Sequence, residues 1–318
     1  MRNVWIIFCF VLAGFSGAFA NVYETFSLGN GKLFVYKEGS VIKKAILQEN
    51  GKSAKCSVEK NKLLCENKEI QRRGSELSFG NVALRSEFSF SLEKLNITQT
   101  YVKKNSIRLE VFCSKDSKIQ NVLDRFYGVE FTCQNAKKTF KELANGLLEK
   151  GIMASCGAQM GESFEKCSKG STFEEVRSDS LRYFDENIVV FDRVDYIYSG
   201  GAHGISEKKG MIFSLDGRKI ALSEILDLQN PKLKELLWGK YQAYQQKQGM
   251  KKGESFLKYE EFNVAKALSL DENGIVFIFQ PYEILPHSYG VVELQVSFDE
   301  IKEFGDFLDS KIAYLFKY

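Results

Sequence analysis

The residues with the clearest potential for chemistry are the only two histidines, His203 and His287, together with Glu283. Two imidazoles and a carboxylate form an accepted ligand set for catalytic zinc. Pro286, however, separates Glu283 from His287, and a proline interrupts the regular helix that would present both on one face. The spacing therefore favours structural roles over a metal site, and we expect no metal and no other cofactor.

Other catalytic arrangements find less support. A glycosidase needs two carboxylates flanking a cleft, and Glu283 with Asp195 or Glu293 is the pair one would propose, but nothing in the spacing selects these acids. No Gly-x-Ser-x-Gly elbow is present for serine catalysis. Cysteine catalysis conflicts with the disulfides expected below. The sequence therefore favours a non-catalytic protein.

Both histidines lie in stretches rich in glycine or proline. Glycine allows positive φ and close backbone approach, so a strand that ends in such a cluster is under a specific geometric demand. We expect the two stretches to meet, with His203 bonded to backbone, Tyr282 packed over it and Glu283 tying an extended loop through backbone amides. The candidate motif or binding residues are Tyr198, Gly200, Gly201, Ala202, His203 and Gly204 in the first stretch, and Pro281, Tyr282, Glu283, Pro286, His287, Tyr289 and Gly290 in the second.

Residues 1–20 are typical of a secretory signal. Arg2 precedes an apolar run, residues 4–13, and Ala18 and Ala20 give a small-x-small site, which predicts cleavage after Ala20. The run is shorter than the about 20 residues of a membrane span. We expect no span after cleavage and a periplasmic or secreted product. The formal net charge of +3 indicates no nucleic-acid partner.

The cysteines indicate disulfides and a division of the chain. An even number in an exported protein is typical of disulfides, several connectivities are open, and sequential pairing is the simplest. The absence of Cys-x-x-Cys argues against a zinc ribbon. We expect a β-rich, stapled module over 21–175, with a small subdomain at 21–80, and an α+β module over 176–318. The six candidates are Cys56, Cys65, Cys113, Cys133, Cys156 and Cys167.

Hydrophobic periodicity predicts an α+β fold of mostly antiparallel sheets with helices packed on one face. Residues 82–113 favour a meander of three strands. Residues 137–150 favour a helix that ends at Gly151, and residues 231–246 a second helix. Strands are expected within 181–198, 275–279 and 291–298, with a hairpin turn at 216–217. A capping box, Ser297 with Glu300, opens a last helix with an apolar stripe to Leu315.

The order of motifs in the second module resembles a known extracytoplasmic domain. These motifs are Tyr-Ser-Gly-Gly-Ala-His at 198–203, the hairpin at 213–219, Leu-Asp-Glu-Asn-Gly at 270–274 and Pro-Tyr-Glu-Ile at 281–284. Residues 181–304 are similar to the domain shared by lysozyme-sensing sigma-V type anti-sigma factors, some peptidoglycan deacetylases and standalone exported bacterial proteins. The sigma-binding segment, membrane helix and deacetylase domain of those relatives have no counterpart here, so their activities do not transfer. His287 stands where an aromatic residue is expected.

The resemblance implies an exported recognition module of the bacterial envelope, with lysozyme or another envelope protein as partner. Because lysozyme is basic, an acidic surface is expected to meet it. A non-catalytic binder of cell-wall glycan or peptide, with peptidoglycan as partner, is the alternative, and a peptidoglycan-active hydrolase is less favoured. The acidic candidates are Glu174, Glu175, Asp179, Asp185 and Glu186.

Overall fold

A computed structural model describes residues 20–49, 52–74, 76–102, 104–156, 163–250 and 256–302, with Ile312 and Leu315. The signal segment and most of the expected last helix lie outside these residues. The fold is α+β with mostly antiparallel sheets, as predicted. Within the described residues, no helix has the length and apolarity needed to cross a membrane.

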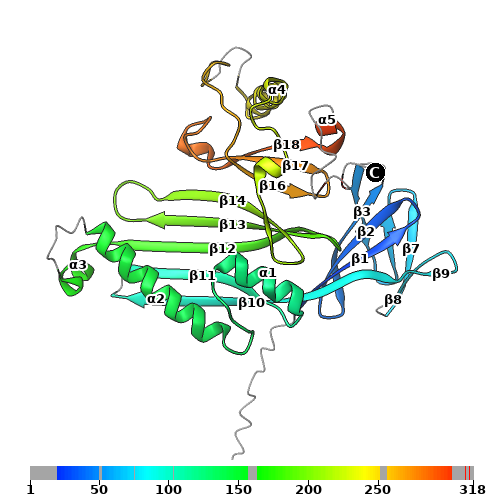
Figure 1. Cartoon of the computed structure of the whole chain (residues 1–318), viewed down its shortest axis with the longest axis horizontal. Helices are drawn as coiled ribbons and strands as arrows, with labels where there is room; N and C mark the ends of the chain where they lie inside the picture. The colour runs from blue at the N-terminus through cyan, green and yellow to red at the C-terminus, as the bar shows by residue number, and fades with distance from the viewer. Residues whose placement is uncertain are drawn as a thin grey trace, which may run out of the picture.

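A ten-stranded sheet forms the centre of the molecule (Figure 1). Its order is β15-β14-β13-β12-β11-β10-β1-β2-β3-β4, and neighbours are antiparallel except β11 with β12. The long strand β10 joins two parts, because its first half pairs with β1 and its second half with β11. The strands are β1 (Asn21–Leu28), β2 (Gly31–Glu38), β3 (Val41–Glu49), β4 (Lys52–Lys55), β10 (Ser86–Tyr101), β11 (Asn105–Cys113), β12 (Phe173–Phe184), β13 (Ile188–Tyr198), β14 (Ile205–Ser214) and β15 (Lys219–Ile220).

Three helices fill the crossover from β11 to β12: α1 (Ser117–Tyr127), α2 (Ala136–Ser155) and α3 (Phe164–Gly170). The Asp116 carboxylate caps α1 by accepting the Ile119 N–H at 3.0 Å. Helix α2 buries Phe140, Ala144 and Leu148 at four-residue spacing against β10 and β11. These contacts build the part of the main core that lies on this face of the sheet.

On the other side of β13 and β14 lies a three-stranded sheet of β16 (Ala267–Asp271), β17 (Gly274–Phe279) and β18 (Val292–Ser297). Every residue of β17 is buried, and α4 (Pro231–Lys247) packs beyond this sheet (Figure 1). Gly210 of β14 is needed here, because a Cβ would lie 2.3 Å from the Leu268 carbonyl oxygen. The short elements are η1 (Leu222–Glu224), η2 (His287–Tyr289) and α5 (Phe298–Ile301), which carries the predicted capping box.

A five-stranded sheet completes the fold with β5 (Ser57–Val58), β6 (Lys62–Cys65), β7 (Lys68–Arg73), β8 (Glu76–Phe79) and β9 (Val82–Ala83). It shares a second core with β1–β3, in which Leu33, Leu63 and Ile70 are fully buried. This core is separate from the main one.

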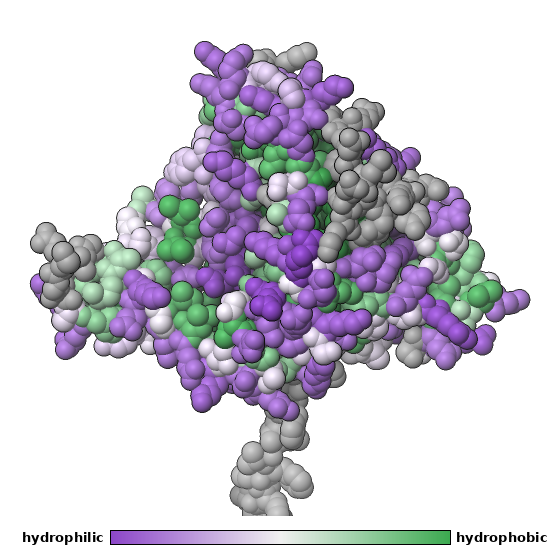
Figure 2. All heavy atoms as spheres, viewed as in Figure 1, coloured by the Kyte–Doolittle hydropathy of each residue, from purple (hydrophilic) through white to green (hydrophobic). Residues whose placement is uncertain are grey.

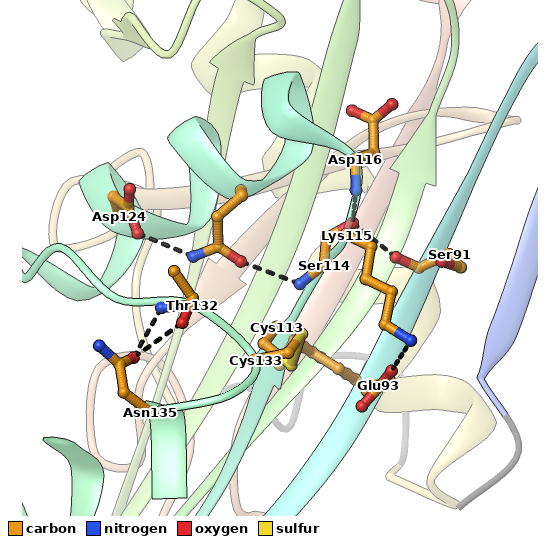
Figure 3. Close-up of a disulfide and its surroundings, with 12 residues drawn as sticks. Ser91, Glu93, Cys113, Ser114, Lys115, Asp116, Asp124, Thr132, Cys133 and Asn135 are labelled. Carbon is orange, nitrogen blue, oxygen red and sulfur yellow. Dashed lines mark hydrogen bonds and ion pairs between the residues drawn. A yellow bond between two sulfur atoms is a disulfide. The ribbon is translucent and has the colours of Figure 1, made fainter. Parts of the chain in front are cut away.

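The three disulfides pair in sequence, the simplest of the connectivities left open by the sequence: Cys56–Cys65, Cys113–Cys133 and Cys156–Cys167. The first lies beside the second core. The second fastens the end of β11 to the segment before α2 (Figure 3), and the third links α2 to α3. The helical crossover is therefore held at both ends of α2.

Two local predictions were wrong. The expected three-stranded meander is one long strand, β10, paired with β11, because residues 86–101 contain no turn. Gly151 does not end its helix, which runs on to Ser155; its missing side chain instead makes room for the Phe173 ring, 2.1 Å from where a Cβ would lie. The proposed boundary after residue 175 falls inside β12, and the division into two modules stays a prediction.

Candidate recognition site

The two glycine- and proline-rich stretches meet, as the sequence predicted. The imidazoles of His203 and His287 stack with centroids 4.0 Å apart and planes inclined by 23°. Nδ1 of His203 and Nε2 of His287 both lie near the Gly204 carbonyl oxygen, at 3.0 and 3.1 Å. Because a carbonyl only accepts, each of these nitrogens donates its N–H. Nε2 of His203 lies 3.5 Å from the Tyr282 hydroxyl, and in the neutral form of the ring it would accept a hydrogen bond from that hydroxyl.

The turn between β13 and β14 depends on its glycines. Gly200 and Gly201 adopt φ of 96° and 94°, which residues with a Cβ rarely adopt. The Tyr198 hydroxyl donates to the Gly201 carbonyl at 3.0 Å and closes the turn. Gly204 is bare because the Tyr196 ring lies 2.4 Å from where its Cβ would stand. Together with the exposed Ala202, these residues shape the turn.

Residues 280–290 form a loop with several anchors. The Gln280 side chain accepts the Lys208 N–H at 2.9 Å and donates to the Lys208 carbonyl at 2.7 Å, as a paired strand would. The Glu283 carboxylate accepts the Gln280 N–H at 2.5 Å, the bracing role expected for it. From α4, the buried Tyr241 hydroxyl donates to the Ile284 carbonyl at 2.9 Å. The loop is therefore fixed to β14 and to α4.

Tyr282 is the exposed residue of this loop. The residue is 63% exposed, and its φ is +70°. Its N–H donates to the Leu285 carbonyl at 3.1 Å. Pro286 introduces η2, the half-buried Tyr289 lies within it, and Gly290 ends it at φ 66°. We call residues 198–204 and 280–290 together the two-loop surface.

The three candidate metal ligands do not converge. Glu283 is engaged by the Gln280 backbone, and both imidazoles face one carbonyl. Among the described residues, the one group of three potential ligands within reach of one another is Glu93 with Cys113 and Cys133. Figure 3 shows that these sulfurs form the disulfide, so they offer no thiolate, and Glu93 pairs with Lys115 at 3.4 Å.

The other acids proposed for a catalytic pair are ion-pair partners. Asp195 binds Arg177 at 2.7 Å and Lys209 at 3.4 Å. Burial alone would raise the pKa of Glu293, yet hydrogen bonds from Lys208 and Arg182 outweigh it and lower this pKa. A general acid requires a raised pKa and access to substrate. The lowered pKa of Glu293 does not meet the first condition, and the burial of Asp195, 8% exposed, does not meet the second.

The expected acidic surface is wrong. Asp179 and Asp185 are 1% and 0% exposed, and Glu175 is buried as well. Asp179 binds the Arg193 guanidinium through both oxygens, and the Asp185 carboxylate accepts backbone N–H groups at the start of β13. Burial raises the pKa of Asp179 and of Glu175. Glu186 pairs with Lys32. The three buried acids stabilise the sheet and offer no docking face, whereas Glu174 is half-buried and Glu186 is exposed.

Five charged side chains were not anticipated as a group. Between the central and three-stranded sheets, Arg182 reaches Asp192 and Glu293 at 2.9 Å and Asp271 at 3.0 Å. Lys208 also binds Asp192, at 3.0 Å, and Glu293. In the sequence these residues are single charges on five separate strands, and the sequence does not reveal which of those strands stack. We call Arg182, Asp192, Lys208, Asp271 and Glu293 the junction cluster.

A cleft of about 730 Å³ adjoins the two-loop surface and was not predicted from the sequence. It lies between the first turn of α4, residues 263–266 and the start of the loop. Asn230, Lys234, Asn263 and Lys266 supply polar groups, and Glu283 contributes to its wall. The cleft therefore offers amides and both signs of charge.

Comparison with known proteins finds a family whose model matches part of the chain. Residues 225–299 match the family described as "Protein of unknown function (DUF3298)". No curated protein matches the chain. A crystal structure of a DUF3298 family member from Bacteroides fragilis is similar with a TM-score of 0.51 at 16% identity, over 72% of this chain and 97% of that one. A DUF3298 family protein from Pseudomonas aeruginosa gives 0.43 at 12% identity, over 67% and 93%. Residues 225–299 thus match the DUF3298 family, and the chain resembles a member of that family in fold.

Proposed function

We propose that this is a non-catalytic recognition protein of the bacterial envelope, which binds a protein partner through the two-loop surface. The observation that supports this most is Tyr282, an exposed tyrosine on a loop whose neighbours are fixed. Exposed tyrosines supply large contact areas and are enriched at binding hot spots. Fixing the loop in advance reduces the ordering cost of association.

Backbone strain at Tyr282 supports the same proposal. A residue with a Cβ at positive φ costs on the order of 1–3 kcal/mol, and such strain concentrates at binding sites. Apolar residues flank the neighbouring turn, since Ile197 and Ile205 pair across β13 and β14 and are 43% and 60% exposed. Figure 2 shows hydrophobic atoms over this end of the hairpin, surrounded by hydrophilic residues. An apolar group with a polar rim is typical of protein interfaces.

The partner to test first is lysozyme, because the motifs of residues 181–304 resemble a lysozyme-sensing domain; another envelope protein is the alternative. Export rests on the predicted signal, residues 1–20. Because three of the five expected acidic residues are buried, contact would depend on shape and the exposed tyrosine more than on opposite net charge.

Titration of the chain lacking residues 1–20 against lysozyme, followed by calorimetry and complex mass, tests this proposal. We expect a complex that Tyr282→Gly weakens at least tenfold. Phe79→Ala is the matched control, because Phe79 is 40% exposed but lies in the five-stranded sheet. Equal weakening by both variants would contradict binding at the two-loop surface.

The cleft favours a second candidate, a binder of soluble peptidoglycan fragments. Its amides and paired charges suit a ligand with hydroxyls, carboxylates and amines. Asn263→Ala and Lys234→Gln should weaken the binding of a purified muropeptide, whereas Lys232→Gln, an exposed neighbour, should not. Binding of neither lysozyme nor muropeptide at hundreds of micromolar would reject the recognition proposal, and turnover of peptidoglycan would reject its non-catalytic part.

A further inference from the structure

A second cavity, of about 180 Å³, lies away from the two-loop surface, where three parts of the chain meet. Tyr23, Phe34 and Ile46 line it from β1–β3, and residues 181–184 line it from β12. Glu272, in the turn from β16 to β17, contributes the third side. The Glu272 carbonyl accepts the side chains of Gln48 at 3.0 Å and Ser53 at 2.7 Å, which holds this turn against β3 and β4.

The walls are mainly aromatic. The rings of Phe34 and Phe184 meet edge-to-face at 5.9 Å, and those of Tyr23 and Phe184 do so at 5.5 Å. The Phe34 ring also lies 5.5 Å from that of Tyr183. Aromatic rings favour such offset or perpendicular contacts with a further ring. An engineered apolar cavity of about 150 Å³ binds benzene, so this volume admits one six-membered ring.

The charges at the cavity select among ring compounds. Arg182 is already engaged by the three carboxylates of the junction cluster. The Lys44 side chain is 51% exposed. Among the described residues, its one ion pair is with the Glu272 carboxylate, at the long N···O distance of 3.8 Å. The Lys44 ammonium therefore has N–H donors left for an anionic group. The nearby Glu272 carboxylate repels anions, which favours a ligand with a single negative charge.

We propose that this cavity binds a small aromatic carboxylate, with its ring packed against Tyr23, Phe34 and Phe184 and its carboxylate on Lys44. The site is independent of the proposed recognition function and shares no residue with the two-loop surface. Because its walls come from β1–β3, β12 and the β16–β17 turn, a bound ring would also bridge these parts.

Benzoate is the test ligand, with benzyl alcohol as its uncharged counterpart. Ligand-detected NMR titrations with the full chain should give saturable binding of benzoate, and NOEs from its ring to Tyr23 and Phe184 should place it in the cavity. Lys44→Gln should weaken benzoate about fivefold, the upper range for an exposed ion pair, and leave benzyl alcohol unchanged. Lys43→Gln is the matched control, because Lys43 pairs with Glu38 and does not line the cavity.

Ile46→Phe provides the steric test, since the larger ring fills the cavity and should abolish the binding of both compounds. If that variant does not fold, the NOEs to Tyr23 and Phe184 in the unaltered protein decide the position. The proposal would be overturned by NOEs to other residues, or by no binding of benzoate at concentrations on the order of 10 mM. An unchanged affinity for benzoate in Lys44→Gln would also overturn it.

Discussion

The junction cluster and the two-loop surface both connect β14 to the region of the three-stranded sheet, by opposite physical means. The junction cluster uses five charged side chains, and Asp192 at its centre is 2% exposed. The two-loop surface uses stacked imidazoles and amide hydrogen bonds beside a largely exposed tyrosine. Lys208 of the junction cluster contacts both, because its ammonium binds Asp192 and Glu293 while its backbone pairs with Gln280 of the two-loop surface.

The difference separates stability from recognition. Buried charges are costly to desolvate and stabilise a fold only as a complete set, so the loss of one member leaves others unpaired. Amide and imidazole contacts near solvent lose less when altered, because water replaces them. We therefore expect substitutions in the junction cluster to lower the unfolding free energy, with no specific effect on partner affinity. Substitutions at Tyr282 should lower partner affinity and change the unfolding free energy little.

The largest effect is expected for Arg182→Met. Methionine retains much of the side-chain length but leaves Asp192, Asp271 and Glu293 with Lys208 as their remaining cation in the cluster. Breaking a buried ion pair on one side costs about 3–5 kcal/mol. Urea unfolding of both proteins measures this difference. Arg73→Met, at an exposed position in β7, should change stability by less than about 0.5 kcal/mol.

A steric break at the same junction should be smaller. Gly210→Ala places a methyl group 2.3 Å from the backbone oxygen of Leu268, so β14 and β16 must separate. Such overpacking costs about 1–3 kcal/mol. Gly239→Ala in α4 is the control: its Cβ meets nothing within 4 Å, and replacing a helical glycine should stabilise by roughly 0.5–1 kcal/mol. Equal midpoints in urea for the two variants would contradict close packing at the junction.

The sequence predicted what depends on local pattern. The apolar runs of β13 and β17, the alternation in β18, the helix from Pro231 and the capping box at Ser297 were all predicted, because each is set by neighbours in the chain. The meeting of His203 with His287 was also anticipated. Chemistry that depends on stacking of distant strands was not: the junction cluster joins residues from β12, β13, β14, β16 and β18.

Single residues show the same limit. Gly151 has the residue type and position expected of a helix end, yet it lies inside α2, where Phe173 of β12, the strand after α3, packs against it. Aspartate is a residue type typical of surfaces, but Asp179 and Asp185 are buried. Arg193 and the backbone amides at the start of β13 satisfy their carboxylates there. Local propensity does not contain these contacts, because tertiary packing decides them.

The pH dependence gives a finer test of the junction cluster. The pKa of Glu293 is lowered in the folded protein, so its stabilising contribution is complete above its unfolded value of about 4.3 and is lost as pH falls through the folded value. The raised pKa values of Glu175 and Asp179 act in the opposite direction, because folding binds their protons more tightly and stability rises as pH falls through that range.

The comparison of Glu293→Gln with the unaltered protein removes these opposing contributions. We expect the variant to be less stable at pH 7, and the difference in unfolding free energy to shrink steadily between pH 5 and the acid limit of folding. Urea midpoints at half-unit steps of pH measure this. A difference that stays constant over the range would show that Glu293 contributes through packing and not through its charge.

The smallest change in stability, and the largest in binding, is expected at Tyr282. Tyr282→Gly removes the ring and also relieves the positive φ, whereas Tyr282→Ala removes the ring and retains a Cβ at that φ. Because positive φ costs residues with a Cβ about 1–2 kcal/mol, the glycine variant should unfold at higher urea than the alanine variant. Its stability should lie within about 1 kcal/mol of the parent, since the greater chain entropy of glycine offsets part of the relief.

Both Tyr282 variants should lose the partner to the same extent, because both lack the ring. This pair of measurements separates the two explanations for a strained tyrosine at an exposed site. If binding followed the stability of the loop, the glycine variant would bind better than the alanine variant. If recognition depends on the ring, as we propose, their affinities coincide while their stabilities differ, and the strain is retained for the contact that Tyr282 makes with the partner.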